Sequence, residues 1–240
     1  MCGRYTLLAQ ADELAAEFDL VEPLEFDSRY NIAPTQDVPV VRYFHAASAP
    51  KMTVVRVSES TGQRRMDILR WGLIPHWAKD TKFAYRTINA RAETVAKQPA
   101  FRDAFRKRRC IVPANGFFEW EKLMVKGKEV KQPHYIRRAD GRPLALAGLW
   151  EHWEGPDGKV IESFTIITTA ANEFLSSLHD RMPVILDRAD YETWLSPDSK
   201  PDDLQALLKP CPSEWLVSSP VSRHVNNPRN DDPSCIEEAS

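Results

Sequence analysis

Short apolar blocks recur along the chain, separated by polar turns. Blocks that alternate apolar with polar positions and are rich in β-branched or aromatic residues are typical of half-buried strands. The block at Ile68–Ile74 ends at Pro75 because proline cannot donate to a strand ladder. The predicted strands are Val38–Tyr43, Met52–Val57, Ile68–Ile74, Cys110–Val112, Phe117–Trp120, His134–Arg138, Leu144–Trp153, Phe164–Thr169 and Pro183–Leu186.

A helical period is found in fewer places. In the first predicted helix, Leu14, Ala15 and Phe18 fall on one face. The predicted helices are Ala11–Phe18, two pieces of Thr87–Arg109 with Pro99 opening the second, Asn172–Leu178, Ala189–Leu195 and Asp202–Leu208. Lys126–Lys128 and Gly155–Gly158 read as hairpin loops.

The chain has no internal repeat and no regular alternation of strands with helices. A mainly antiparallel α+β domain is therefore expected. Its 240 residues fit one domain, which we assign to residues 1–227, followed by a polar, acidic tail at residues 228–240. We expect the last residues of this tail to be disordered.

Composition excludes several classes of protein. No apolar run approaches the ~20 residues of a membrane span, and no signal peptide is visible at the start. The four cysteines form no CxxC pair, and no histidine stands at metal-ligand spacing from them. We expect no metal, no cofactor and no disulfide framework, and a cytoplasmic location, on the nucleoid if the source is bacterial.

Positive charge is concentrated in one part of the chain. Residues 61–110 hold 13 lysines and arginines against 4 acidic residues, although the whole chain has a net charge of −2. Aromatic residues such as Trp77 are interleaved with these charges, a combination suited to single-stranded nucleic acid. For Arg102–Arg109 a solvated helical face explains the charges equally well.

Cys2 follows Met1 directly, and this position can give it two reactive groups. If Met1 is removed, Cys2 presents an α-amine with a pKa of about 7.7–8.0 beside a thiol of about 8.5. The amine can condense with an aldehyde, and the thiol can then close a five-membered thiazolidine. The alternative is an unremarkable cysteine near a frayed terminus.

Four other motifs supply polar groups. Asn89 and Arg91 stand two residues apart at a predicted helix entry, where an amide can orient an oxygen and a guanidinium can hold a phosphate. Glu119 lies in the aromatic strand Gly116–Trp120, on the opposite face from Phe118 and Trp120, where lost hydration would raise its pKa. His179 can move protons near neutral pH. A helix cap, an edge-strand carboxylate and a surface histidine are the plainer alternatives, and Asn31–Thr35 alone reads as a turn.

In order along the chain these motifs read M-C-G-R-Y, N-I-A-P-T, W-G-L-I-P-H-W, N-A-R-A-E-T, C-I-V-P-A-N-G-F-F-E-W, A-G-L-W-E, F-T-I-I-T-T-A-A-N and H-D-R-M-P-V-I-L. The set resembles the SOS-response-associated peptidase (SRAP) family, whose members shield abasic sites in DNA, from Met1 to about Asn227. The resemblance implies a β-barrel-like core with flanking helices and a basic cleft for single-stranded DNA. It implies Cys2 as nucleophile, with Asn89, Glu119 and His179 completing the site. The expected DNA contacts are Arg4, Arg91, Trp120 and Arg181, to which we add Asn31, Trp77 and Thr168.

The expected activity is a covalent thiazolidine crosslink between Cys2 and an abasic site in single-stranded DNA, with strand cleavage (lyase activity) as a side reaction. Two alternatives stay open: a cysteine (auto)peptidase in which His179 activates Cys2, and a reader of modified bases that never bonds to DNA. The partner is single-stranded DNA with abasic sites, with replication-fork proteins as a further candidate. The protein is expected to be a monomer with no membrane partner.

Overall fold

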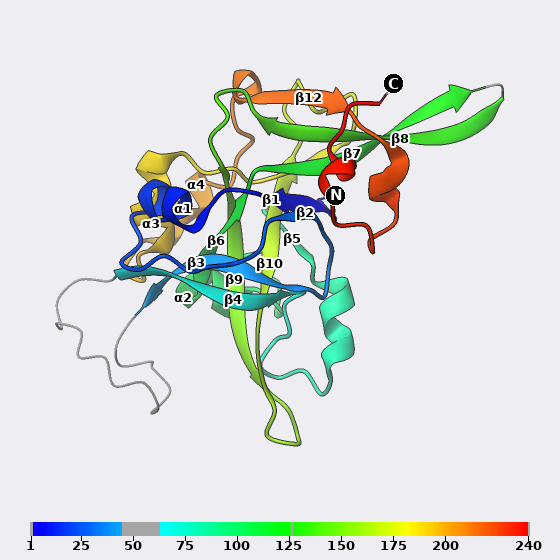
Figure 1. Ribbon diagram of the computed structural model, residues 1–240. Coiled ribbons are helices and arrows are strands. Elements are labelled where there is room, and N and C mark those ends of the chain that lie inside the picture. The colour runs from blue at the N-terminus through cyan, green and yellow to red at the C-terminus, as the bar shows by residue number, and fades with distance from the viewer. Residues whose placement is uncertain (1, 45–62, 126, 240) are drawn as a thin grey trace.

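A computed structural model describes residues 2–44, 63–125 and 127–239 (Figure 1). The predicted strand Met52–Val57 lies outside these residues. Of the helices described, none is long and apolar enough to cross a membrane.

Five strands close into a mixed barrel. The strands are β3 (Asp37–Phe44), β4 (Gln63–Trp71), β6 (Arg109–Ala114), β9 (Leu144–Glu154) and β10 (Val160–Ala170). They are hydrogen-bonded in the order β10-β4-β3-β6-β9, and β9 pairs again with β10, which completes the ring. The β10–β4 pair is parallel, while the other pairs in the ring are antiparallel. Closure leaves no edge strand within the ring and encloses the main core, in which Trp71 stacks on Phe164.

A second, antiparallel sheet lies beside the barrel (Figure 1). Its strands are β12 (Leu216–Pro220), β8 (Lys128–Arg138), β7 (Gly116–Val125), β1 (Tyr5–Leu7) and β2 (Arg29–Ile32), in that order. The short strands β5 (Asn89–Arg91) and β11 (Arg181–Pro183) both pair with β10. These pairings bring Cys2, Asn89, Glu119 and His179, which are far apart in sequence, to the region between the two sheets.

The helices are short and lie outside the strands (Figure 1). The α-helices are α1 (Ala11–Phe18), α2 (Arg102–Lys107), α3 (Tyr191–Leu195) and α4 (Pro201–Ala206). The 3₁₀ turns are η2 (Thr81–Arg86), η3 (Arg188–Asp190), η4 (Ser213–Trp215), η5 (Arg223–Asn226) and η6 (Pro233–Cys235). The expected barrel-like α+β domain with flanking helices is confirmed, and α1 has the predicted bounds.

Two helix predictions are wrong. Within Thr87–Arg109 only α2 is α-helical, because Asn89–Arg91 pairs in parallel with Ile166–Thr168 as strand β5. Residues 172–178 form turns rather than a regular helix; Asn172 begins them by accepting from the backbone N–H of Leu175 through its side chain. In both places tertiary contacts override local propensity.

The expected disorder of the tail is also wrong for the residues that the structure describes, up to Ala239, whose N–H bonds the Pro220 carbonyl at 3.0 Å. Asp231 pairs with the Arg29 guanidinium and accepts from the backbone N–H of Asn31 at 3.0 Å. Cys235 is fully buried in a small cluster with Phe118 and Val225. Asp231 therefore binds the tail to β2, and Cys235 packs it against β7.

Candidate active site

Cys2 lies just before β1, and its side chain is fully buried. Burial raises the pKa of its thiol well above the usual range, and the nearby Glu119 carboxylate raises it further. The Asn89 side chain donates from Nδ2 to the Cys2 carbonyl at 2.9 Å. In the part of the chain that the structure describes, Asn89 Oδ1 is buried and has no hydrogen-bond partner. Asn89 thus holds the Cys2 main chain through Nδ2, while its Oδ1 can still accept a hydrogen bond from a ligand.

Glu119 lies on β7 with its side chain 3% exposed. The predicted alternation is confirmed: Phe118 and Trp120 pack in the cluster under the tail, whereas Phe117 belongs to the main core. Burial raises the pKa of Glu119, and the neighbouring His179 charge opposes this rise. A carboxyl of this kind accepts and returns a proton more readily near neutral pH than an exposed one.

His179 precedes β11, and its ring is oriented by the main chain. Its Nδ1 accepts from the backbone N–H of Arg181 at 2.9 Å and also lies 2.8 Å from Asp180 Oδ1. These two contacts require opposite protonation states of Nδ1. We favour the first for the neutral ring, because the backbone N–H is fixed and the Asp180 side chain is 86% exposed. The proton of neutral His179 is then on Nε2.

An open cleft of about 480 Å³ contains two of the predicted catalytic residues. Its lining residues are Glu119, Trp120, Lys122, Lys131, His179 and Asn226. Asn226 accepts from the Trp120 indole N–H at 2.7 Å and so fixes one wall. The two lysines are exposed and stand opposite each other on β7 and β8, which makes the entrance positive.

The predicted DNA contacts divide by exposure. Arg91 on β5 is exposed. Trp77 is 48% exposed and meets Phe83 edge-to-face at 5.3 Å. Thr168 is fully buried, and its carbonyl accepts from Arg181 at 2.6 Å. Exposed aromatic and cationic side chains remain available to a ligand, whereas Thr168 orients another side chain.

Arg181 is mostly buried and already paired. Its guanidinium bonds both Glu93 carboxylate oxygens, at 2.6 and 3.0 Å. The pair lowers the pKa of Glu93, to which the nearby charge of Arg91 also contributes. Glu93 was not among the predicted site residues, because its partner stands 88 positions away in the chain.

Arg4 and Asn31 belong to an internal network. Arg4 donates to Asn31 Oδ1 at 2.9 Å and to the Val225 carbonyl at 3.0 Å. The fully buried Asn31 amide donates to the carbonyls of Val225, Asn227 and Asn230 at 3.1, 3.0 and 2.7 Å. Burial lowers the pKa of Arg4. Both side chains therefore hold the tail behind Trp120, a role that a turn motif does not indicate.

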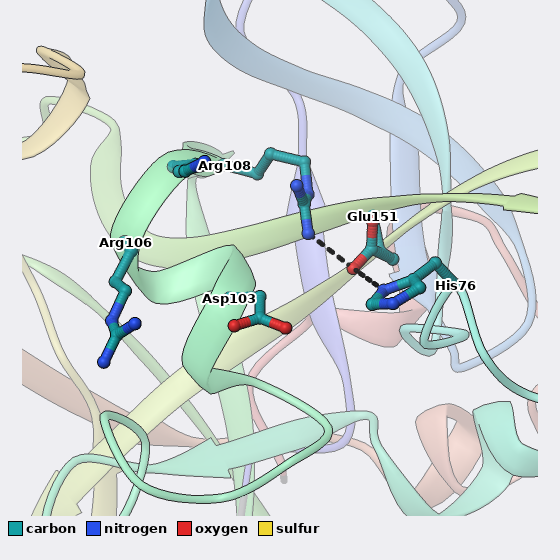
Figure 2. A pocket seen from close by; sticks show the side chains of 6 residues that line it. His76, Asp103, Arg106, Arg108 and Glu151 are labelled. Atoms are coloured by element: carbon teal, nitrogen blue, oxygen red, sulfur yellow. Dashed lines mark hydrogen bonds and ion pairs between the residues drawn. The ribbon is translucent and has the colours of Figure 1, made fainter.

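A second cleft, of about 400 Å³, lies at the basic helix α2. Figure 2 shows Arg108 and His76 pointing toward Glu151, while Arg106 points away from it. Arg108 bonds the buried Glu151 at 2.7 Å. Arg108 is thus neutralised within the protein, and the neighbouring Arg109 is buried and donates to the Trp194 carbonyl. The remaining basic residues of the segment are exposed: Arg102, Arg106 and Lys107.

The chain is similar to known proteins of one family over nearly its whole length. The family model described as "SOS response associated peptidase (SRAP)" matches residues 1–228. The chain is 39% identical over 241 residues to "Abasic site processing protein YoqW" of Bacillus subtilis, covering 99% of each chain. It is 31% identical to "Abasic site processing protein HMCES" of Xenopus tropicalis, covering 88% of this chain and 66% of the relative. A crystal structure of a Bacteroides thetaiotaomicron protein superimposes with a TM-score of 0.80 at 28% identity, covering both chains fully. The chain belongs to the SRAP family.

Proposed function

We propose that this protein processes abasic sites in single-stranded DNA by forming a thiazolidine crosslink through Cys2. The relatives' names supply the substrate class. The observation that carries the proposal is that Asn89 bonds the Cys2 carbonyl, and that Glu119 lies near both the Cys2 thiol and His179. Cys2 is the residue whose amine and thiol, once Met1 is gone, can both bond one aldehyde carbon.

The reaction requires two bonds and the loss of one water. The Cys2 amine adds to C1′ of the ring-opened sugar, and the resulting carbinolamine loses water to give an imine. The thiol sulfur then adds to the imine carbon, and its proton passes to the nitrogen. The net product is the thiazolidine plus water. If the thiol does not close the ring, the imine acidifies the C2′ proton, and β-elimination cleaves the strand.

The side chains divide this work. The buried thiol holds its proton tightly, so ring closure needs an acceptor, and Glu119 beside it is suited to that task. In its imidazolium form, in which Nδ1–H would face Asp180 at 2.8 Å, His179 is suited to give its Nε2 proton to the departing carbinolamine hydroxyl. Asn89 Oδ1 is placed to accept from the Cys2 amine while Nδ2 holds the carbonyl.

The DNA path follows the exposed cations and aromatics. Arg91, Lys122 and Lys131 are exposed and suited to phosphates, while Trp77 and Trp120 offer ring faces for unpaired bases. Arg181 contributes a cation beside Glu93, and Arg4, Asn31 and Thr168 support the cleft walls from within.

The test is to mix the protein with single-stranded DNA carrying one abasic site and to separate the products under denaturing conditions. The mass of the active protein should show loss of Met1, and the parent should give a heat-stable adduct without reductant. Cys2→Ala should give none, but its amine should still yield an adduct trapped by borohydride. Cys211→Ser, in a different part of the core, is the matched control.

Other outcomes point elsewhere. A heat-stable adduct formed by Cys2→Ala would refute the thiazolidine. Peptide cleavage that requires Cys2, without any adduct, would favour the cysteine peptidase. Reversible binding alone would favour a non-covalent reader.

Adduct rates between about pH 5 and 9, a span that brackets histidine and α-amine pKa values, separate the two proton carriers. Glu119→Gln should be slow and should recover at high pH, where Cys2 loses its protons unaided. His179→Ala should be least impaired at low pH, where solvent acid replaces it. Parallel profiles for parent and variants would leave both residues as positioning groups.

A further inference from the structure

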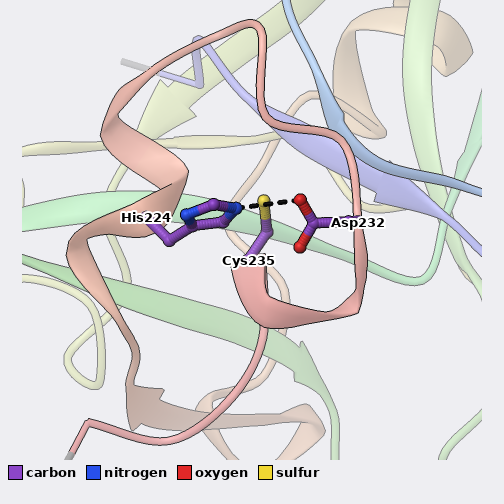
Figure 3. A group of neighbouring side chains, drawn as sticks. All are labelled: His224, Asp232 and Cys235. Carbon is purple, nitrogen blue, oxygen red and sulfur yellow. Dashed lines mark hydrogen bonds and ion pairs between the residues drawn. The ribbon is translucent and has the colours of Figure 1, made fainter.

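Three potential metal ligands from η5, η6 and the turn between them meet near the C-terminal end of the described chain. The donor atoms of His224, Asp232 and Cys235 lie within 4.8 Å of one another. Figure 3 shows the His224 ring from η5 and the Cys235 sulfur from η6 pointing toward the Asp232 carboxylate. The contact between His224 Nε2 and Asp232 Oδ2 is 2.8 Å. His224 and Asp232 are eight residues apart, and Asp232 and Cys235 are three apart. These spacings match none of the common zinc motifs, so this group was not predicted from the sequence.

Hydrogen bonds with neighbouring main-chain and side-chain groups orient all three ligands. Asp232 Oδ1 accepts from the backbone N–H of Ser234 at 3.0 Å, which turns Oδ2 toward His224. Asn230 Nδ2 donates to the His224 carbonyl at 2.8 Å and to Nδ1 at 3.1 Å, which turns Nε2 inward. Cys235 is fully buried, and its thiol donates to the Asn230 carbonyl at 3.5 Å. The ligands are thus held in place before any ion arrives.

We propose that His224 Nε2, Asp232 Oδ2 and Cys235 Sγ form a Zn²⁺ site that fastens the C-terminal tail. Imidazole, carboxylate and thiolate are the ligands that zinc takes in proteins, and water completes four-coordination. Zinc bonds of about 2.0–2.3 Å place tetrahedral ligand atoms about 3.3–3.6 Å apart. The sulfur must therefore move inward by about 1 Å, and the His224–Asp232 contact must open by about half an ångström.

Binding has a defined proton balance. The Cys235 thiol loses one proton to solvent as sulfur bonds the metal, Asp232 binds as the carboxylate, and the His224 proton shifts from Nε2 to Nδ1. That nitrogen now faces the Asn230 NH₂ group, so the Asn230 amide must turn to offer an acceptor. A carboxylate at position 230 would supply the acceptor directly, as in the carboxylate–histidine–zinc arrangement.

The site bears on the cleft through the loop that it closes. This loop carries Asn226, which fixes the Trp120 indole, and its carbonyls at Val225, Asn227 and Asn230 receive the Asn31 amide. An ion joining His224 to Cys235 would restrain both ends of that loop. Zinc binding is therefore expected to stabilise the cleft wall.

The experiment is a titration of the full-length Cys2→Ala protein, which lacks the other chemically exceptional thiol, with Zn²⁺ against a chromogenic chelator. One equivalent should bind with release of one proton, and Co²⁺ should give thiolate charge-transfer absorption. His224→Ala and Cys235→Ser should lose both signals, whereas Cys211→Ser should keep them. Asn230→Asp should tighten binding by about tenfold or more.

The proposal fails if the Cys2→Ala protein takes up no zinc at micromolar concentration, or if Cys235→Ser binds with the same stoichiometry and cobalt spectrum. The Asn230→Asp variant keeps all three ligands, so it decides the matter even if the other variants unfold. Weaker binding by Asn230→Asp than by its parent would also overturn the assigned geometry.

Discussion

Replacing Asn31 with alanine tests whether this side chain supports the tail or contacts DNA. Its amide donates to the carbonyls of Val225, Asn227 and Asn230 and accepts from Arg4, and no part of it is exposed. The NH₂ group has two hydrogens, so the three carbonyls share them, and alanine removes these contacts together with the bond from Arg4. The three carbonyls and the guanidinium are then left without this partner in a mostly buried place.

The magnitude follows from those contacts. At about 1 kcal/mol for each hydrogen bond, two donated by the amide and one accepted from Arg4 give a loss of about 3 kcal/mol, with a smaller part returned wherever water reaches the carbonyls. Domains have about 5–15 kcal/mol of stability in total, so Asn31→Ala should lower the urea midpoint severely. The tail should also become sensitive to protease before the barrel does.

The matched control is Asn227→Ala, because Asn227 is exposed and its side chain accepts one bond from Arg229 at 3.1 Å. It should cost about 0.5 kcal/mol or less. The reasoning is refuted if Asn31→Ala stays within about 1 kcal/mol of its parent, the value of a single hydrogen bond. Lost affinity for single strands with unchanged stability would make Asn31 the DNA contact that the sequence predicted.

Three further predictions concern burial, backbone shape and charge. Burial raises the pKa of Glu119 above that of an unfolded carboxyl, so its ionisation opposes folding as pH rises. Glu119→Gln should therefore have a higher melting temperature than its parent at pH 7, and this gain should vanish in acid. Gly72 has φ of +119°, and an added Cβ would lie 2.8 Å from the Ala84 carbonyl oxygen. Gly72→Ala should therefore lower the free energy of unfolding, measured by thermal melting, by about 1–3 kcal/mol. Gly158→Ala should lower it less, because no atom lies within 4 Å of the added Cβ. Glu93→Gln frees Arg181 to contact a phosphate, so the slope of log binding constant against log salt concentration, measured by anisotropy with single strands, should steepen by about 0.7. Weaker binding at every salt concentration would instead mean that Glu93 positions Arg181.

The sequence predicted the elements whose pattern is local. The α1 stripe and the alternation of β7 both depend on neighbours within a few positions, and the structure has both. The strand β5 was missed because its three residues are held by β10, which lies more than 70 positions away. Ring closure through β9 and β10 was likewise invisible to periodicity and was expected only from the resemblance.

The site shows the same division. The resemblance singled out Cys2, Asn89, Glu119 and His179, whereas their local settings alone left plainer alternatives open. The structure bonds Asn89 to Cys2 and sets Glu119 near Cys2 and His179. Lys122 and Lys131 read as ordinary charges until strand pairing placed them across from each other. Contacts between side chains distant in sequence, such as that of Arg181 with Glu93, can be identified only from the three-dimensional structure.

The attachment of the tail to β2 sets an order of events during synthesis. Asp231 bonds the backbone of Asn31 across 200 positions, and Asn226 completes the cleft wall beside Trp120. Because chains emerge from the N-terminal end, Cys2 leaves the ribosome long before the residues that enclose it. Asn89 and Glu119, which lie beside Cys2, are made next, and the cleft wall at Trp120 is completed only when Asn226 and Asp231 have followed. A long pause late in translation should therefore prolong the interval in which the cleft lacks this wall.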